Sequence, residues 1–218
     1  MKRYDAVVWD WNGTLLDDVD LCLVVVNEVL ADYGAPALSR ERYLDIFDFP
    51  ARLYWKRAGL NLDRIDFNEV SARFRELFEN QLSRANLQPG TLHILGLVHR
   101  AGIRQFLISN TEHSALARMT ESYGLTAFFD AIQGMDTGLA DGKLPAARLI
   151  LERFSLDPSR VLLVGDTSHD AEVARKLGAA CVLVAEGHQG PGRLRGLGVP
   201  VRASFRELSD QFAEMLGA

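Results

Sequence analysis

Short apolar runs rich in β-branched residues alternate along this chain with segments of helical period, and this alternation limits the fold more than any other feature. The runs are AVVW, IRQFLIS, FFDAIQG, VLLVG and CVLVA. The segments between most of them carry helix signals: TLHILGLVHRAG, SALARMTESYG and HDAEVARKLG end on glycine, and PAARLILERF begins with proline. Strands that alternate with helices pair in parallel, with helices on both faces. The sequence therefore predicts an α/β fold with a doubly wound parallel sheet.

The alternation is interrupted after the first apolar run. Residues 18–87 contain only segments of helical pattern. The last of them has an apolar face whose residues are three and four positions apart: Phe67, Val70, Phe74 and Leu77. We therefore expect an α/β core formed by residues 1–17 and 88–218, with residues 18–87 as a small α-helical cap inserted after the first strand.

Charge and composition exclude some classes of partner. The chain has 218 residues and a formal net charge of −5 at pH 7, so it lacks the positive charge typical of proteins that bind nucleic acid or membrane surfaces. The run LCLVVVNEVL is too short to cross a membrane. Cys22 and Cys181 lie in apolar runs without a CxxC motif, so we expect reduced core thiols and a cytoplasmic protein. We expect no nucleic acid and no membrane partner, and no pattern sets the oligomeric state.

Polar residues follow three of the apolar runs at their carboxyl ends: Asp10, Ser109 with Asn110, and Asp166. Taken singly, such an aspartate is more often a turn or a helix cap than a catalyst. In open α/β sheets, however, ligands bind at this edge, so we expect the three ends to converge. With Asp170 nearby, the carboxylates repel one another unless a cation offsets them. Mg²⁺ suits this role, because it binds one or two carboxylates, a carbonyl oxygen and waters.

A metal of this kind also compensates the charge of a phosphate, which is then held by further hydrogen-bond donors. A small anionic substrate is compatible with an acidic protein, because such ligands are bound locally. Lys143 lies in the loop before the proline-started helix, where a lysine taken alone is more often a solvated turn residue. The candidates to contact the substrate are Asn12, Gly13, Thr14, Ser109, Asn110 and Lys143.

Four motifs in chain order, DWNGTLLD, FLISN, GKLP and GDTSHD, closely resemble those of the haloacid dehalogenase-like (HAD) hydrolases, in particular the phosphoglycolate phosphatase-like branch. The resemblance extends from Tyr4 to about Phe205. It implies a Rossmann-like core, a helical cap between the first and second motifs, and Mg²⁺-dependent hydrolysis of a small phosphorylated metabolite. Asp10 matches the nucleophile, which forms an aspartyl phosphate in such enzymes.

The resemblance also implies roles for other matching residues. Ser109 matches the hydroxyl that binds the transferring phosphoryl group, and Lys143 matches the cation that neutralises it. Asp166 matches the metal-binding carboxylate, with Asp170 close by in the same motif. Asn12 matches the position whose main-chain carbonyl also binds Mg²⁺.

Asn12 departs from the family pattern, because most of these phosphatases have an aspartate there that protonates the leaving oxygen and later activates water. An asparagine amide cannot give or take a proton at neutral pH, and general acid–base catalysis typically contributes about 10²–10⁴ in rate. Three interpretations stay open: a substrate with a good leaving group such as an acyl or aryl phosphate, a phosphometabolite-binding or regulatory protein with little turnover, or another proton donor. Motif neighbours that could donate a proton are Asp17, Asp18, Glu112, His113 and His169.

Other chemistries in the same superfamily fit less well. The aliphatic dehalogenases also lack the second aspartate, but they have no use for a Mg²⁺-type motif such as GDTSHD. The phosphonate-cleaving branch forms a Schiff base with a cap lysine, and Lys56, the one lysine within residues 18–87, is better interpreted as a solvated helix residue. A phosphoacceptor receiver domain also combines aspartates, a hydroxyl and a lysine, but it has no helical cap. The sequence therefore favours phosphate ester hydrolysis.

Overall fold

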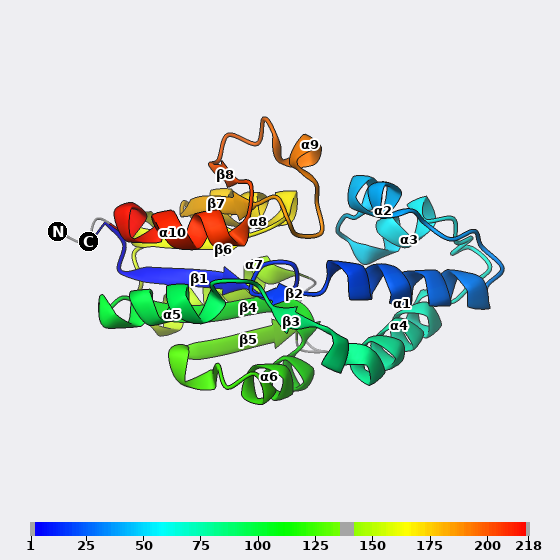
Figure 1. Ribbon diagram of the computed structural model, residues 1–218, viewed down its shortest axis with the longest axis horizontal. Coiled ribbons are helices and arrows are strands. Elements are labelled where there is room, and N and C mark those ends of the chain that lie inside the picture. The colour runs from blue at the N-terminus through cyan, green and yellow to red at the C-terminus, as the bar shows by residue number, and fades with distance from the viewer. Residues whose placement is uncertain (1–2, 136–141, 217–218) are drawn as a thin grey trace.

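The computed structural model describes residues 3–135 and 142–216. Within them, six parallel strands form one sheet in the order β5-β4-β1-β6-β7-β8, which confirms the doubly wound α/β prediction (Figure 1). The strands are β1 (Ala6–Asp10), β4 (Arg104–Glu112), β5 (Ala131–Met135), β6 (Val161–Gly165), β7 (Ala180–Val184) and β8 (Val201–Arg202). β1 lies between β4 and β6, so the strand order reverses beside it, and a ligand site is expected at its carboxyl end.

Helices cover both faces of this sheet (Figure 1). They are α5 (Thr91–Arg100), α6 (His113–Ser122), α7 (Lys143–Arg153), α8 (Ser168–Leu177), α9 (Pro191–Leu194) and α10 (Phe205–Leu216), with 3₁₀ turns at Thr126–Phe128 and Pro158–Arg160. Val7 and Trp9 of β1 pack into one core with α5, α6 and α10, whereas Ala6 and Val8 pack into a second core with α7 and α8. Every residue of β1 is buried, as expected for a parallel strand covered on both faces.

Four helices form a unit beyond the carboxyl ends of the strands (Figure 1). They are α1 (Val19–Asp32), α2 (Arg40–Ile46), α3 (Ala51–Arg57) and α4 (Phe67–Gln81), and the 3₁₀ turn Leu82–Arg84 follows. The apolar face predicted for α4 packs into the same core as α1. The chain enters the unit through β2 (Leu16–Asp17) and leaves it through β3 (Asn86–Leu87), and these strands pair antiparallel. No sequence pattern predicts this pair, because two residues are too few for an alternating pattern.

Three local features differ from the expectation. β4 continues through Ser109 and Asn110 to Glu112, with a shift in its register against β5 after Ile108. α7 begins at Lys143, so this lysine is the first residue of the helix and does not lie in the preceding loop. The motifs also did not predict α9, β8 and α10 near the carboxyl terminus, although α10 covers the sheet with the buried residues Phe205, Leu208, Phe212 and Leu216.

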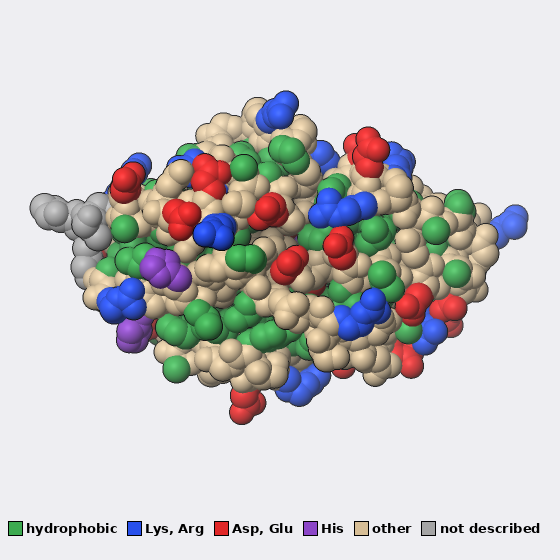
Figure 2. Space-filling model, in the orientation of Figure 1, with side chains coloured by type: hydrophobic (Ala, Val, Ile, Leu, Met, Phe, Trp, Pro, Cys, Tyr) green, Lys and Arg blue, Asp and Glu red, His purple; other side chains and the backbone are tan. Residues whose placement is uncertain are grey.

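The two cysteines are free thiols, and the surface carries charges of both signs (Figure 2). Cys22 and Cys181 are buried free thiols, as the sequence predicts. Among the described residues, no helix has both the length and the apolar character that a membrane crossing requires. On the face shown in Figure 2, Lys and Arg side chains are interspersed with Asp and Glu.

Glu112 caps α6, and this cap allows a prediction about stability. Its carboxylate accepts hydrogen bonds from the Ser114 hydroxyl at 2.6 Å and from the amides of Ser114 at 3.0 Å and Ala115 at 2.9 Å, which lower the pKa of Glu112 to about 2. We expect Glu112→Gln to lower the free energy of unfolding by about 0.5–1 kcal/mol at pH 7. Because the pKa of Glu112 is lowered in the folded state, its carboxylate stabilises the fold at pH values above the ordinary pKa of 4.5. This stabilisation is lost as the pH falls toward 2.

Urea unfolding at pH 7 and at pH 3 tests this prediction, since the difference between Glu112→Gln and the parent chain should shrink at the lower pH. Glu121→Gln is the control, because Glu121 lies near the other end of the same helix, where a negative charge is not favoured by the helix dipole. Equal losses in the two variants at both pH values would contradict the capping role of Glu112.

Candidate functional site

The carboxyl end of β1 brings together four charged side chains from distant parts of the chain. Asp10 is the last residue of β1, Asp166 follows β6, Lys143 begins α7 and Asp170 lies in the first turn of α8. Each of these residues is 3% exposed or less. Charged side chains are rarely buried without partners, so this group needs internal pairing or a bound ion.

Lys143 is held between two carboxylates. Its Nζ lies 2.7 Å from Asp10 Oδ1 and 2.6 Å from Asp170 Oδ1. Burial alone would lower the pKa of Lys143, but the carboxylates of Asp10 and Asp170 raise it, so the lysine is a cation at neutral pH. Asp170 Oδ2 accepts hydrogen bonds from the amide of Thr167 at 3.1 Å and from its hydroxyl at 2.7 Å. Both oxygens of Asp170 are therefore engaged, and this residue fixes the position of Lys143.

The other carboxylate oxygens of this group lie near Thr14. Its hydroxyl donates to Asp10 Oδ2 at 3.2 Å and lies 3.4 Å from Asp166 Oδ1, while Asp166 Oδ2 accepts a hydrogen bond from the His188 amide at 2.5 Å. Burial raises the pKa of Asp10 and of Asp166, and the neighbouring carboxylates raise both further. Ligand oxygens of Asp10, Asp166 and Asp170 lie within 4.8 Å of one another, so the oxygen-only donor set fits a hard divalent cation.

The side chains of Asp166 and His188 leave no room for a Cβ at position 13, so this position requires a glycine. Its φ is +72°, and a Cβ at this position would lie 2.3 Å from Asp166 Oδ2 and 2.7 Å from His188 Cδ2. The Gly13 amide, a candidate donor to the substrate, donates to Asp18 Oδ1 at 2.8 Å in this structure. Gly13 therefore joins the first motif to Asp18, a buried carboxylate that the sequence marks only as a possible proton donor.

A comparison of two glycines separates this crowding from backbone strain. Gly13→Ala is expected to lower the free energy of unfolding by about 3 kcal/mol or more, because it combines a left-handed backbone with overpacking. Gly34→Ala is the matched control: Gly34 has φ +68° and nothing within 4 Å of its Cβ position, so it should lose only about 1–2 kcal/mol. Thermal or urea unfolding measures both, and equal losses would show that the contact with Asp166 relaxes easily.

Both polar atoms of the Asn12 side chain form hydrogen bonds. Its Nδ2 donates to Asp18 Oδ2 at 2.7 Å, and its Oδ1 accepts from the Thr111 hydroxyl at 2.8 Å and lies 3.4 Å from Ser109 Oγ. Because an ionised carboxylate only accepts hydrogen bonds, the amide nitrogen of Asn12 is the group that must face Asp18. The departure of Asn12 from the family pattern is thus matched by a nearby buried aspartate.

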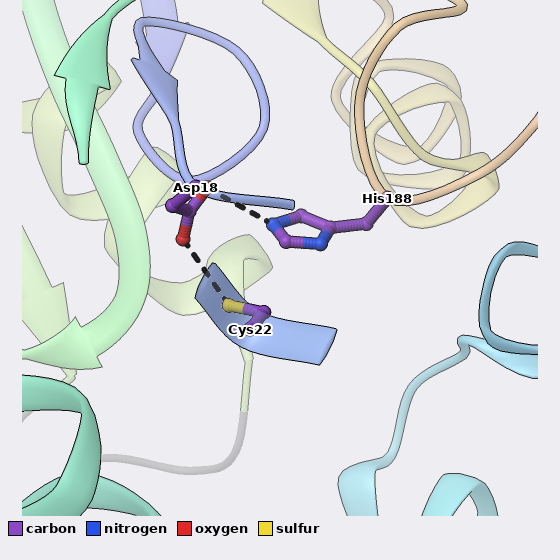
Figure 3. A group of neighbouring side chains, drawn as sticks. All are labelled: Asp18, Cys22 and His188. Atoms are coloured by element: carbon purple, nitrogen blue, oxygen red, sulfur yellow. Dashed lines mark hydrogen bonds and ion pairs between the residues drawn. The ribbon is translucent and has the colours of Figure 1, made fainter. Parts of the chain in front are cut away.

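Asp18 is the centre of a second buried group (Figure 3). Its Oδ1 lies 3.3 Å from His188 Nε2, and its Oδ2 accepts from Cys22 Sγ at 3.3 Å. Burial would raise the pKa of Asp18, but His188 and the donors from Asn12 and Gly13 lower it. Burial would lower the pKa of His188, whereas Asp18 raises it. Asp18 and His188 therefore form a buried ion pair.

The loop after β7 connects this group to the helical unit. His188 Nδ1 lies 2.8 Å from the Tyr43 hydroxyl of α2, and the rings of His188 and Phe47 stack with centroids 4.7 Å apart. Gln189 Nε2 donates to the Phe47 carbonyl at 3.0 Å, and Arg193 donates to the same carbonyl. The helical unit therefore contacts the α/β core through ring packing and through side-chain hydrogen bonds to the Phe47 carbonyl.

The alternative proton donors considered for the Asn12 position differ in their burial and in their contacts. Asp18 contacts Asn12 directly. Asp17 and His113 are exposed, and Glu112 caps α6. His169 is partly buried, its ring packs 5.1 Å from that of Phe49, and its Nε2 has no hydrogen-bond partner within the described residues.

Two further sequence candidates have distinct surroundings. Asn110 follows Ser109 in β4, and both polar atoms of its side chain are buried without a hydrogen-bond partner in the described part of the chain. Lys56, considered as a Schiff-base lysine, is exposed on α3 and lies 3.4 Å from Asp63. This position agrees with its interpretation as a solvated helix residue.

His188 and Tyr43 are contacts that the sequence interpretation missed. The stretch GHQG follows the carboxyl end of β7, which is the same sheet edge as Asp10 and Asp166, so the edge rule could have flagged His188. No comparable signal marks Tyr43, because helix periodicity does not show which residue of a helical insertion reaches the core.

Comparisons with known proteins agree with this geometry. A family model described as haloacid dehalogenase-like hydrolase matches residues 7–184. Phosphoglycolate phosphatase 1 of Pseudomonas aeruginosa is 28% identical over 189 residues, which cover 84% of this chain and 70% of that protein. A phosphoglycolate phosphatase of Vibrio parahaemolyticus is 25% identical over 220 residues, which cover 96% of this chain and 93% of that protein.

Solved structures share the fold. A haloacid dehalogenase-like family hydrolase from Streptococcus pneumoniae superposes with a TM-score of 0.83 at 19% identity and covers 96% of this chain and 99% of its own. CbbY from Rhodobacter sphaeroides, solved in complex with phosphate, gives a TM-score of 0.76 at 21% identity and covers 94% and 96% of the two chains. At these identities the likeness establishes the architecture.

Proposed function

Because this chain belongs to the haloacid dehalogenase-like hydrolases and is a phosphoric monoester hydrolase, we propose that it is a Mg²⁺-dependent phosphatase that acts on a small organic phosphate through an aspartyl phosphate at Asp10. The observation that carries the proposal is the buried ion pair of Asp10 with Lys143 beside Asp166, at the carboxyl end of the central strand. The named phosphatase relatives make 2-phosphoglycolate the first alkyl phosphate to test.

The reaction begins with attack by an Asp10 carboxylate oxygen on phosphorus, so an O–P bond forms as the bond to the leaving oxygen breaks. Lys143 and Ser109 are assigned to the phosphoryl oxygens, where a fixed positive charge and a hydroxyl stabilise the developing negative charge. Asp170 is assigned to hold Lys143, because both of its oxygens are already bonded to Lys143 and Thr167. Water then hydrolyses the phospho-Asp10 anhydride and releases phosphate.

The carboxylates of Asp10 and Asp166 and the main-chain carbonyl of Asn12 are the proposed Mg²⁺ ligands, with Asp170 as a further carboxylate near the site. Bound Mg²⁺ would neutralise and orient the phosphoryl group. The closely spaced oxygens of the three aspartates support this assignment.

Asn12 limits which substrates turn over fast. Its amide cannot protonate a leaving alkoxide, so acyl and aryl phosphates, whose leaving groups need little protonation, should be preferred. The same amide cannot activate water, so hydrolysis of phospho-Asp10 should be slow and the intermediate should accumulate.

We assign residues 18–87 to a cap that selects the substrate, and residues 1–17 and 88–218 to the core that carries the chemistry. Tyr43 and Phe47 of the helical unit pack on His188, and Phe49 packs against His169, so all three rings meet the core beside the aspartates. Closure of such a unit excludes water during the first transfer.

The test is phosphate release with and without Mg²⁺ from acetyl phosphate, p-nitrophenyl phosphate and 2-phosphoglycolate. We expect Mg²⁺-dependent release, with kcat/KM for the acyl and aryl phosphates at least about tenfold above that for the alkyl ester. Rapid acid quench and intact-mass measurement should find one phosphoryl group on the chain. Tight binding of 2-phosphoglycolate without release from any of the three compounds would instead support a phosphometabolite-binding protein.

A further inference from the structure

Beside the aspartates proposed for Mg²⁺ lies a buried group with a different set of donor atoms (Figure 3). Asp18 precedes α1, Cys22 lies one turn further along α1, and His188 comes from the loop after β7. The three residues are 0%, 6% and 3% exposed. One oxygen, one sulfur and one nitrogen atom from them lie within 4.8 Å of one another.

This donor set selects against Mg²⁺ and for a thiophilic cation. Mg²⁺ prefers oxygen ligands in octahedral geometry, whereas Zn²⁺ binds thiolate, imidazole and carboxylate at about 2.0–2.3 Å. Asp18 lies 3.3 Å from both Cys22 Sγ and His188 Nε2, through its two oxygens, so only a small closure of the three side chains is needed to reach one ion. Three protein ligands leave a fourth position for water.

The surroundings already hold the three donors in place. The Tyr43 hydroxyl bonds His188 Nδ1, which leaves Nε2 directed at Asp18, and the Phe47 ring stacks on the imidazole. The Asn12 side chain and the Gly13 amide hold Asp18. Partners of this kind, which orient ligand side chains, are typical of protein metal sites.

We propose that Asp18, Cys22 and His188 form a binding site for a thiophilic divalent cation, best suited to Zn²⁺, next to the phosphatase site. On binding, bonds form from the metal to Cys22 sulfur and to His188 Nε2, and both the thiol proton and the Nε2 proton of the imidazolium are released to solvent.

The experiment uses the purified full chain in excess Mg²⁺, so that the oxygen-only site is occupied, and adds Co²⁺ as a spectroscopic substitute for Zn²⁺. We expect one equivalent of Co²⁺ to give a thiolate-to-cobalt charge-transfer band, which Zn²⁺ abolishes by displacement. Cys22→Ser should lose the band, and competition with a chromogenic chelator should show Zn²⁺ affinity lowered at least about tenfold. Cys181→Ser is the matched control, since it removes the other buried thiol and should keep both signals.

His188→Gln is the second variant, in case Cys22→Ser does not fold as judged by circular dichroism. It should keep the thiol and weaken Zn²⁺ binding by a similar factor. Absence of a charge-transfer band in the parent chain, or a band that survives in Cys22→Ser, would overturn the proposal. Because these readouts do not use turnover, a chain that binds Co²⁺ through Cys22 but releases no phosphate would refute the phosphatase assignment and leave the metal site standing.

Discussion

Asn12→Asp alone is expected to lower the free energy of unfolding at pH 7 by about 2–4 kcal/mol and to leave alkyl phosphate turnover low. The cause is Asp18, because the amide that donates to its Oδ2 at 2.7 Å would be replaced by a second, partly buried carboxylate next to the fully buried carboxylate of Asp18. Two carboxylates at this distance share one proton, so one of their pKa values rises. A carboxyl with a raised folded-state pKa costs no stability below the unfolded pKa of about 3.9, because it is protonated in both states. It lowers the free energy of unfolding as the pH rises above that value. The loss measured by urea unfolding should therefore be smaller at pH 4 than at pH 7.

The paired change Asn12→Asp with Asp18→Asn exchanges the donor and the acceptor and keeps the hydrogen bond. Both this pair and Asp18→Asn alone lose the ion pair of Asp18 with His188, so we expect the paired change to be at least as stable as Asp18→Asn alone. The kcat of the paired variant for 2-phosphoglycolate should rise at least about tenfold, since a general acid typically contributes about 10²–10⁴. Asp18→Asn alone is the matched control and should bring no such gain. If Asn12→Asp alone is as stable as the parent chain and has the highest kcat of the three variants, the hydrogen bond to Asp18 does not determine which residue is accepted at position 12.

The second large effect is expected at Asp10. Asp10→Asn should reduce kcat for p-nitrophenyl phosphate by at least about 10⁴-fold and abolish the phosphorylated intermediate, because the attacking oxygen is lost. The thermal midpoint should stay equal or rise, since the change removes one of several buried carboxylates whose burial and mutual repulsion raise their pKa. Lys143 keeps Asp170 as its partner.

Asp17→Asn is the matched control for Asp10→Asn. Asp17 is an exposed carboxylate in β2, in the same motif as Asp10. It should retain turnover, which would also exclude Asp17 as the proton donor. Substantial residual turnover in Asp10→Asn would remove Asp10 as the nucleophile.

The strand-end residues were predictable because a parallel sheet has one carboxyl edge. Asp10 and Asp166 each end an apolar run, so the alternation of strands and helices was enough to predict that they converge. Lys143 was identified only through the order of the four motifs, because a lysine after glycine has no distinctive pattern of its own.

The surroundings of Asn12 were not predictable in the same way. Its partners Asp18 and Thr111 lie six and 99 positions away, and each meets it through the path of an irregular turn or a strand end. His188 and Tyr43 meet across 145 positions, at a contact between a loop and the helical unit. Periodicity predicts which face of an element is buried, but it does not predict which polar atoms pair between elements.

The pairing of β2 with β3 has a consequence for how such a protein diversifies. Leu16 lies opposite Leu87, so the chain leaves the α/β core and returns to it at neighbouring points. Residues can be gained, lost or replaced between two adjacent points without a change in the length or register of any core strand. The helical insertion can therefore be exchanged as a module, and a descendant of this chain can acquire a new substrate while Asp10, Lys143 and Asp166 stay where they are.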